Sequence, residues 1–96
     1  MGTGIKEIVI QEIKDIAKKH RINKVILFGS RARGDYHRAS DIDLAVLGED
    51  VTGFILDVNE DTSTLLEYDI VDLSSDLQDN FRKVILKEGI LLYEEV

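Results

Sequence analysis

Cysteine is absent from this 96-residue sequence, and so are long apolar runs. Without cysteine there is neither a disulfide framework nor a thiolate zinc site. No apolar run approaches the roughly 20 residues that a helix needs to cross a bilayer, and the first residues lack the charged and apolar regions of a secretory signal peptide. We therefore expect no membrane association and a cytoplasmic location.

Positive charge is also scarce: 12 lysine and arginine residues stand against 19 aspartate and glutamate residues, for a net charge of -7. Stable nonspecific binding to nucleic acid requires clustered cations, so we expect none. The same charge does not exclude a nucleotide, because carboxylates that hold a divalent cation can receive a metal-bound triphosphate. The placement of the acids therefore matters more than their number.

With 96 residues and 44% hydrophobic content, the chain can build one compact core and not two. We expect a single domain over residues 1–96. A large substrate would then have to bind on an open surface or against a partner chain.

Apolar periodicity predicts alternating helices and strands along the chain. The expected elements are a helix over 4–20, a strand over 25–28, a helical turn opening at Gly29-Ser30, a strand over 41–47, a helix over 51–58 capped by Thr52, a strand over 66–73, a helix that starts with a capping box of Ser75 and Gln78 and closes at Gly89, and an edge strand or packed tail over 90–93.

This order predicts an α/β (α+β) fold with helices packed on a mixed sheet of three or four strands. About a dozen residues connect the first two strands, which is too short for a crossover helix. We therefore expect these two strands to be antiparallel.

Two aspartates stand at the head of the second strand. Because side chains alternate along a strand, Asp41 and Asp43 should point to the same face, while Ile42 points to the other. Two neighbouring carboxylates repel each other unless a cation relieves them, and hard divalent ions prefer such oxygen ligands. The pair therefore predicts a metal site, with a solvated strand end as the simpler alternative.

The third strand offers a further acid. Asp69 lies in its middle, where an uncompensated buried carboxylate would cost several kcal/mol, so it must pair, bind metal or reach water. If this strand lies beside the second, Asp69 can join Asp41 and Asp43. Asp72, an odd number of residues away, should face the opposite side as a hydrogen-bonding or capping residue, although a register slip of one residue would exchange the two roles.

Between the first two strands lies a loop suited to phosphate. Gly29 lets a phosphate approach the backbone, and the Ser30 hydroxyl can donate to a phosphate oxygen. Arg31 and Arg33 add positive charge to the same loop, although such arginines are as often solvated as bound to a ligand. A strand followed by Gly-Ser is weak evidence alone, but Gly-Ser followed by Asp-x-Asp at the head of another strand is much more specific.

These residues carry a resemblance to a known family. The segments Phe28-Gly29-Ser30-Arg31-Ala32-Arg33-Gly34 and Ser40-Asp41-Ile42-Asp43-Leu44 resemble the signature of the DNA polymerase beta-like nucleotidyltransferase superfamily, in its minimal branch. The segments around Asp69-Ile70-Val71-Asp72-Leu73 and Lys87-Glu88-Gly89-Ile90-Leu91-Leu92-Tyr93 are similar to that branch as well. The resemblance therefore covers nearly the whole chain.

The resemblance implies a nucleotidyltransferase fold and a two-metal transfer of a nucleoside monophosphate from an NTP, with AMP from ATP as the expected case and Mg²⁺, or alternatively Mn²⁺, as the cofactor. It implies that Gly29 and Ser30 hold the triphosphate, that Asp41 and Asp43 bind both ions, and that Asp69 completes the metal site and helps to activate the acceptor hydroxyl.

The resemblance also implies a partner. Members of this branch commonly pair with small helical proteins of the HEPN type in toxin-antitoxin systems, where the nucleotidyltransferase can place AMP on a tyrosine of the toxin. A second hypothesis is a binding module that neutralises its partner by contact alone, with a weak or inactive nucleotide site. The acceptor and the choice between homo-oligomer and hetero-oligomer stay open.

Overall fold

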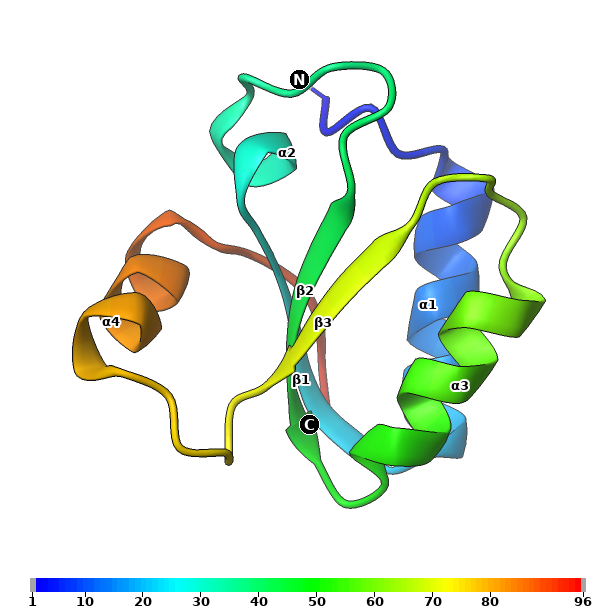
Figure 1. The fold of residues 1–96 in the computed structure, drawn as a ribbon. Coiled ribbons are helices and arrows are strands. Elements are labelled where there is room, and N and C mark those ends of the chain that lie inside the picture. The colour runs from blue at the N-terminus through cyan, green and yellow to red at the C-terminus, as the bar shows by residue number, and fades with distance from the viewer. Residues whose placement is uncertain (1, 96) are drawn as a thin grey trace.

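A computed structural model describes residues 2–95 as a four-stranded sheet with helices on both faces (Figure 1). The elements in chain order are α1 (Glu7–Lys19), β1 (Ile22–Phe28), α2 (Ser30–Arg33), β2 (Ile42–Gly48), α3 (Val51–Asp61), β3 (Tyr68–Asp72), α4 (Asp79–Glu88) and β4 (Ile90–Glu94). Within these residues no helix is long and apolar enough to cross a membrane.

The strands follow the order β3-β2-β1-β4. β1 is antiparallel to both β2 and β4, whereas β2 and β3 are parallel. The expected antiparallel pairing of the first two strands, the mixed sheet and the terminal edge strand are thus confirmed. The parallel pair is possible because the longer connection from β2 to β3 contains α3, which packs back on the sheet.

The main core lies on one face of the sheet, beneath α1 and α3, which lie side by side in Figure 1. Alternation along β2 sends every second side chain into this core. Its buried members are Val9, Ile13, Ile16 and Ala17 of α1, Ile22, Val25 and Leu27 of β1, Ile42, Leu44 and Val46 of β2, and Val51, Phe54 and Val58 of α3.

A smaller cluster lies on the opposite face, beneath α4. It contains Ile26 and Phe28 of β1, Ala45 of β2, Leu73 and Ile85. Ile85 is the one α4 residue that is buried, because α4 covers this face loosely. Asp43 alternates with Ile42 and Leu44 of the main core, so its side chain belongs to this second, more open face.

Two expected helix caps are wrong. Asp50, and not Thr52, is the N-cap of α3, and its carboxylate accepts a hydrogen bond of 3.0 Å from the Gly53 amide. Helix α4 starts after Gln78 without a side-chain cap bond, so the predicted capping box does not form. The Ser75 hydroxyl donates instead to the Asp72 carbonyl within the turn that follows β3. Gly89 closes α4 as expected.

Strand β1 also starts earlier than predicted. The expected strand covers residues 25–28, but β1 already begins at Ile22. The turn is tight because Arg21 adopts a left-handed backbone conformation, with φ of 57°. The chain therefore passes from α1 to β1 through His20 and Arg21 alone.

Candidate active site

A glycine joins the end of β1 to the short helix α2 at the candidate site. Gly29 has φ of 77° and ψ of -158°, a conformation that is essentially restricted to glycine. A Cβ atom at this position would also collide with the Asp43 carboxylate. Glycine is therefore required at position 29 for two reasons: the backbone conformation, and the close approach of the Gly29-Ser30 loop to Asp43.

The three predicted acids gather at one end of the sheet. In the parallel pair, Asp43 lies directly beside Asp69, and in the antiparallel pair it lies opposite Phe28, the last residue of β1. Asp41 immediately precedes β2, two residues before Asp43. The predicted proximity of Asp69 to Asp43 is thus confirmed, and it follows from the two-residue alternation of both strands.

The pKa of Asp43 depends on its burial and on the charges of its neighbours. Burial raises the pKa of its carboxyl above the ordinary 3.8, and the nearby carboxylates of Asp69 and Asp41 raise it further, while Arg33 acts in the opposite direction. Asp43 is half-buried, whereas Asp41 and Asp69 are exposed. The site therefore concentrates negative charge, which a cation would relieve.

Asp72 plays the hydrogen-bonding role that was expected of it. Its Oδ1 atom accepts bonds from the amide and the hydroxyl of Ser74, at 2.9 and 2.7 Å. It pairs in register with Val46, three positions beyond the pair of Asp43 and Asp69. Asp72 therefore shapes the turn after β3, and Asp69 is the acid of β3 that lies beside Asp43.

The donor set suits a hard divalent ion, because three carboxylates supply oxygen ligands alone. Over residues 2–95, no three acid or histidine side chains already stand close enough together to hold one ion. The side chains of Asp41 and Asp69 are exposed, so packing does not hold either carboxylate in one position. The residue types therefore fit a metal, and binding would require side-chain rotation.

The loop beside the acids carries the predicted phosphate-binding residues. Ser30 is the first residue of α2, and its carbonyl accepts bonds from the Gly34 and Asp35 amides. In the described part of the chain, the Ser30 amide has no protein acceptor, as expected at the start of a helix. Ser30 thus has an amide and a hydroxyl available beside Asp43.

Arg33 extends from α2 toward α4. Its guanidinium forms ion pairs with Asp35 at 3.3 Å and with Glu88 at 3.5 Å. The side chain is partly exposed, and its charge lowers the pKa of Asp43. Arg33 therefore brings positive charge to the site while Asp35 and Glu88 hold its guanidinium. The link to Glu88, the last residue of α4, had no signal in the sequence.

Arg31 differs from its expected role as a phosphate contact. Its side chain is 2% exposed, and its guanidinium donates to the carbonyl oxygens of Thr3, Arg38 and Ser40 at 2.9 to 3.1 Å, with a longer bond to that of His37. It also lies 4.8 Å from the centre of the Tyr36 ring. Because its donors face the protein's own backbone, Arg31 holds the α2–β2 loop and the N-terminal segment together. The structure thus gives Arg31 a structural role in place of the expected phosphate contact.

The sequence of residues 11–96 matches the family described as "Polymerase beta, Nucleotidyltransferase". The chain belongs to this family. One curated relative, "Putative protein adenylyltransferase MJ0604" of Methanocaldococcus jannaschii, is 37% identical over 82 residues, which cover 76% of this chain and 80% of the relative.

Solved structures place the chain in the minimal branch of the family. A structure described as a "putative minimal nucleotidyltransferase" superposes with a TM-score of 0.73 at 26% identity, over 94% of this chain and 95% of the other. A "toxin-antitoxin with AMP-PNP" has a TM-score of 0.69 at 23% identity, over 90% of this chain and 73% of the other, and it supports the shared fold. The predicted nucleotidyltransferase fold and its minimal branch are thus confirmed.

Proposed function

We propose that this chain transfers AMP from ATP to a hydroxyl acceptor on a partner protein, with release of pyrophosphate. The observation that carries the proposal is the pairing of Asp43 with Asp69 on adjacent strands, with Asp41 two residues away and the Gly29-Ser30 loop packed against Asp43. The acids and the Gly29-Ser30 loop meet at one end of the sheet, which suits the positioning and charge stabilisation that nucleotidyl transfer requires.

In this proposal Asp41, Asp43 and Asp69 hold two divalent ions, with Mg²⁺ as the expected metal and Mn²⁺ as the alternative. When bound, such ions neutralise the triphosphate and lower the pKa of an acceptor hydroxyl. The raised pKa of Asp43 supports the proposal, because burial first and the carboxylates of Asp69 and Asp41 second disfavour its ionised form, and a bound cation would stabilise that form.

The protein's own groups position the nucleotide. Gly29 makes the turn that brings the start of α2 close to Asp43, and the amide and hydroxyl of Ser30 donate to the triphosphate oxygens. Arg33 contributes positive charge from the end of α2, where Glu88 orients it. Catalysis then rests mainly on the orientation of the α-phosphate toward the acceptor hydroxyl.

A protein acceptor is supported by the name of the M. jannaschii relative, a protein adenylyltransferase, and by the fold shared with a toxin-antitoxin component. We take the acceptor to be a tyrosine of a HEPN-type helical toxin, in a reaction that draws on cytoplasmic ATP. Isotope-labelled ATP mixed with the protein and such a partner should place AMP on that tyrosine, whereas partners with phenylalanine there should stay unlabelled.

The first test is calorimetric titration with ATP, with and without Mg²⁺. The wild type should bind ATP in a Mg²⁺-dependent manner, and the Asp41→Asn, Asp43→Asn variant should not. A Glu60→Gln, Asp61→Asn variant is the matched control, because it removes two exposed charges from α3, which covers the face of the sheet opposite Asp43. Equal binding by wild type and the Asp41→Asn, Asp43→Asn variant would refute the assignment of the metal site.

Exposed apolar side chains on α4 and β4 favour a second candidate, a module that neutralises a partner by contact. Val84 is 46% exposed, Leu86 60% and Leu91 50%, and such side chains are typical of surfaces that bind other proteins. Pyrophosphate release separates the two functions. An enzyme releases it when ATP, metal and partner are mixed, whereas a contact module binds the partner without releasing any.

A further inference from the structure

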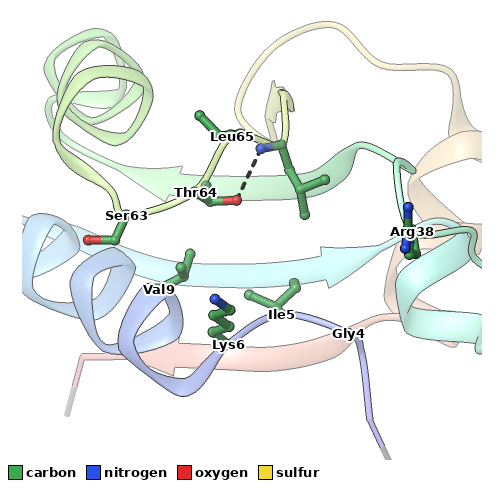
Figure 2. Close-up of a pocket in the computed structure, with 9 residues that line it drawn as sticks. Gly4, Ile5, Lys6, Val9, Arg38, Ser63, Thr64 and Leu65 are labelled. Carbon is green, nitrogen blue, oxygen red and sulfur yellow. Dashed lines mark hydrogen bonds between the residues drawn. The ribbon is translucent and has the colours of Figure 1, made fainter.

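A cavity of about 320 Å³ lies outside the candidate active site. Three segments line it: the start of α1 with the residues before it, the α2–β2 loop at Arg38, and residues 63–66 before β3 (Figure 2). Ile5, Val9 and Leu66 of its lining belong to the main core beneath α1 and α3, whereas Asp43 lies on the opposite face of the sheet. The cavity is therefore separate from the acids and the Gly29-Ser30 loop.

Two cations from distant parts of the chain flank this cavity. Lys6 precedes α1 and Arg38 lies between α2 and β2, and Figure 2 places their side chains on two sides of the cavity. Both residues are exposed, and over residues 2–95 neither forms an ion pair. The lining contains no aspartate or glutamate, although acids outnumber cations in the chain. This concentration of unpaired positive charge favours an anion.

The rest of the lining is suited to an apolar body. Ile5, Val9 and Leu66 offer aliphatic surface. At the rim, Thr64 accepts a bond from the Leu66 amide at 3.1 Å, which leaves its hydroxyl hydrogen free to donate.

The segment 63–66, which forms one wall of the cavity, is held by hydrogen bonds to α1. Glu12 accepts bonds from the amide and the hydroxyl of Ser63, both at 2.7 Å. The Glu12 carboxylate is thus already engaged with the protein. The wall is held in place and the cavity is formed before a ligand arrives, which lowers the entropic cost of binding.

We propose that this cavity binds a small organic anion, with a phosphate or carboxylate head between Lys6 and Arg38 and an apolar body against Ile5, Val9 and Leu66. A volume of about 320 Å³ lies within the range of small-molecule sites. Arg38 lies three residues before Asp41, and Leu66 three residues before Asp69. A bound anion would therefore contact both segments that lead into the acid-bearing strands, and its binding does not depend on the proposed transfer reaction.

The test is a titration of isotopically labelled protein, followed by amide chemical shifts in EDTA so that the acid site holds no metal. Phenyl phosphate and phenylacetate are the two probes with both a head and a body. Inorganic phosphate supplies the head alone, and benzyl alcohol the body alone. At least one of the first two should bind with Kd on the order of 1 mM and shift the amides of residues 5–9 and 63–66. The tighter of them identifies the head group.

Variants decide whether the cations bind the head. The Lys6→Gln, Arg38→Gln variant should weaken binding about tenfold or more, as expected for the loss of charge-assisted hydrogen bonds. The Lys83→Gln, Lys87→Gln variant removes the same charge from exposed positions of α4 and should bind as the wild type does. Unchanged binding in the first variant would overturn the proposal. So would shifts confined to residues 29–34, equally tight binding of benzyl alcohol, or no binding of either two-part probe.

Discussion

The two faces of the sheet differ in how they are covered. Beneath α1 and α3 lies a cluster of 13 buried residues, whereas the face beneath α4 has a cluster of five, of which α4 supplies Ile85 alone. The acids lie on this second face, where Asp43 is half-buried among like charges. Stability and chemistry are thus separated across the sheet, so that one face can tolerate repulsive charge because the other supplies most of the apolar burial.

The largest expected effect tests this separation with two phenylalanines. Phe54 of α3 is fully buried in the main core, whereas Phe81 of α4 is 38% exposed and meets Phe28 edge to face at 5.8 Å. Phe54→Ala should lower the free energy of unfolding by about 3–5 kcal/mol, and Phe81→Ala by about 1 kcal/mol. Urea unfolding followed by circular dichroism measures both. Equal losses would mean that α4 contributes to stability as much as α3 does.

A second substitution tests the link between the candidate site and the rest of the chain. Arg31→Lys keeps the charge but cannot reproduce the planar set of bonds to the carbonyls of Thr3, Arg38 and Ser40. We expect a loss of about 2–3 kcal/mol, because buried carbonyls lose donors. Arg33→Lys, at a partly exposed ion pair, should lose much less. If the Arg31 variant kept full stability and lost ATP binding, Arg31 would be a ligand contact after all.

Elements and faces could be predicted because they depend on local spacing. The alternation of Asp41, Ile42 and Asp43 assigned each side chain to a face, and the same alternation in β3 selected Asp69 over Asp72. The short connection between β1 and β2 likewise fixed their antiparallel pairing. The selection of Asp69 also assumed that the third strand lies beside the second, which the pairing of β2 with β3 confirms.

Contacts between distant residues could not be predicted. Arg31 accounts for one case, because its acceptor at Thr3 lies 28 positions away. The cavity is another, since Lys6, Arg38 and Thr64 meet only when three segments fold together. The predictions of the two helix caps were wrong for a related reason. Several polar residues near the start of each helix are able to cap it, and the path of the preceding loop determines which of them lies at the N-cap position.

A smaller effect of opposite sign is expected on the acid face. Because the pKa of Asp43 is raised in the folded protein, folding favours its protonated form, and its ionised form destabilises the protein above that pKa. Asp43→Asn should therefore raise the melting temperature at neutral pH, and the gain should shrink as pH falls and the wild-type carboxyl is protonated. Asp72→Asn should instead lower it, because Ser74 donates two bonds to that carboxylate. Thermal melts from pH 4 to pH 8 compare the two variants. A destabilised Asp43→Asn would show that burial of the ionised Asp43 carboxylate and its repulsion by Asp69 and Asp41 do not destabilise the fold.

The smallest effect concerns a cluster of ion pairs between α1 and α3, on the face of the sheet that carries the main core. His20, at the end of α1, lies between two carboxylates of the α3 region, with Nε2 2.7 Å from Asp57 and Nδ1 2.8 Å from Asp50. Hydrogen bonding to Asp57 is the main cause that raises the pKa of His20 above 6.5, with Asp50 adding to it. A protonated imidazole donates from both nitrogens and so satisfies both partners.

The sign of the pH dependence follows from these shifts. A raised histidine pKa stabilises the fold fully below pH 6.5, and this contribution is lost as pH rises through the folded-state value, whereas the lowered pKa values of Asp50 and Asp57 add stability above their ordinary 3.8. His20→Gln should therefore cost most between about pH 4.5 and pH 6.5 and less at pH 9, with a loss below about 1 kcal/mol. The difference in melting temperature between wild type and variant measures it. A difference that stays constant across this range would mean that His20 acts through neutral packing, so that the α1 and α3 face owes its stability to apolar burial without help from this charge cluster.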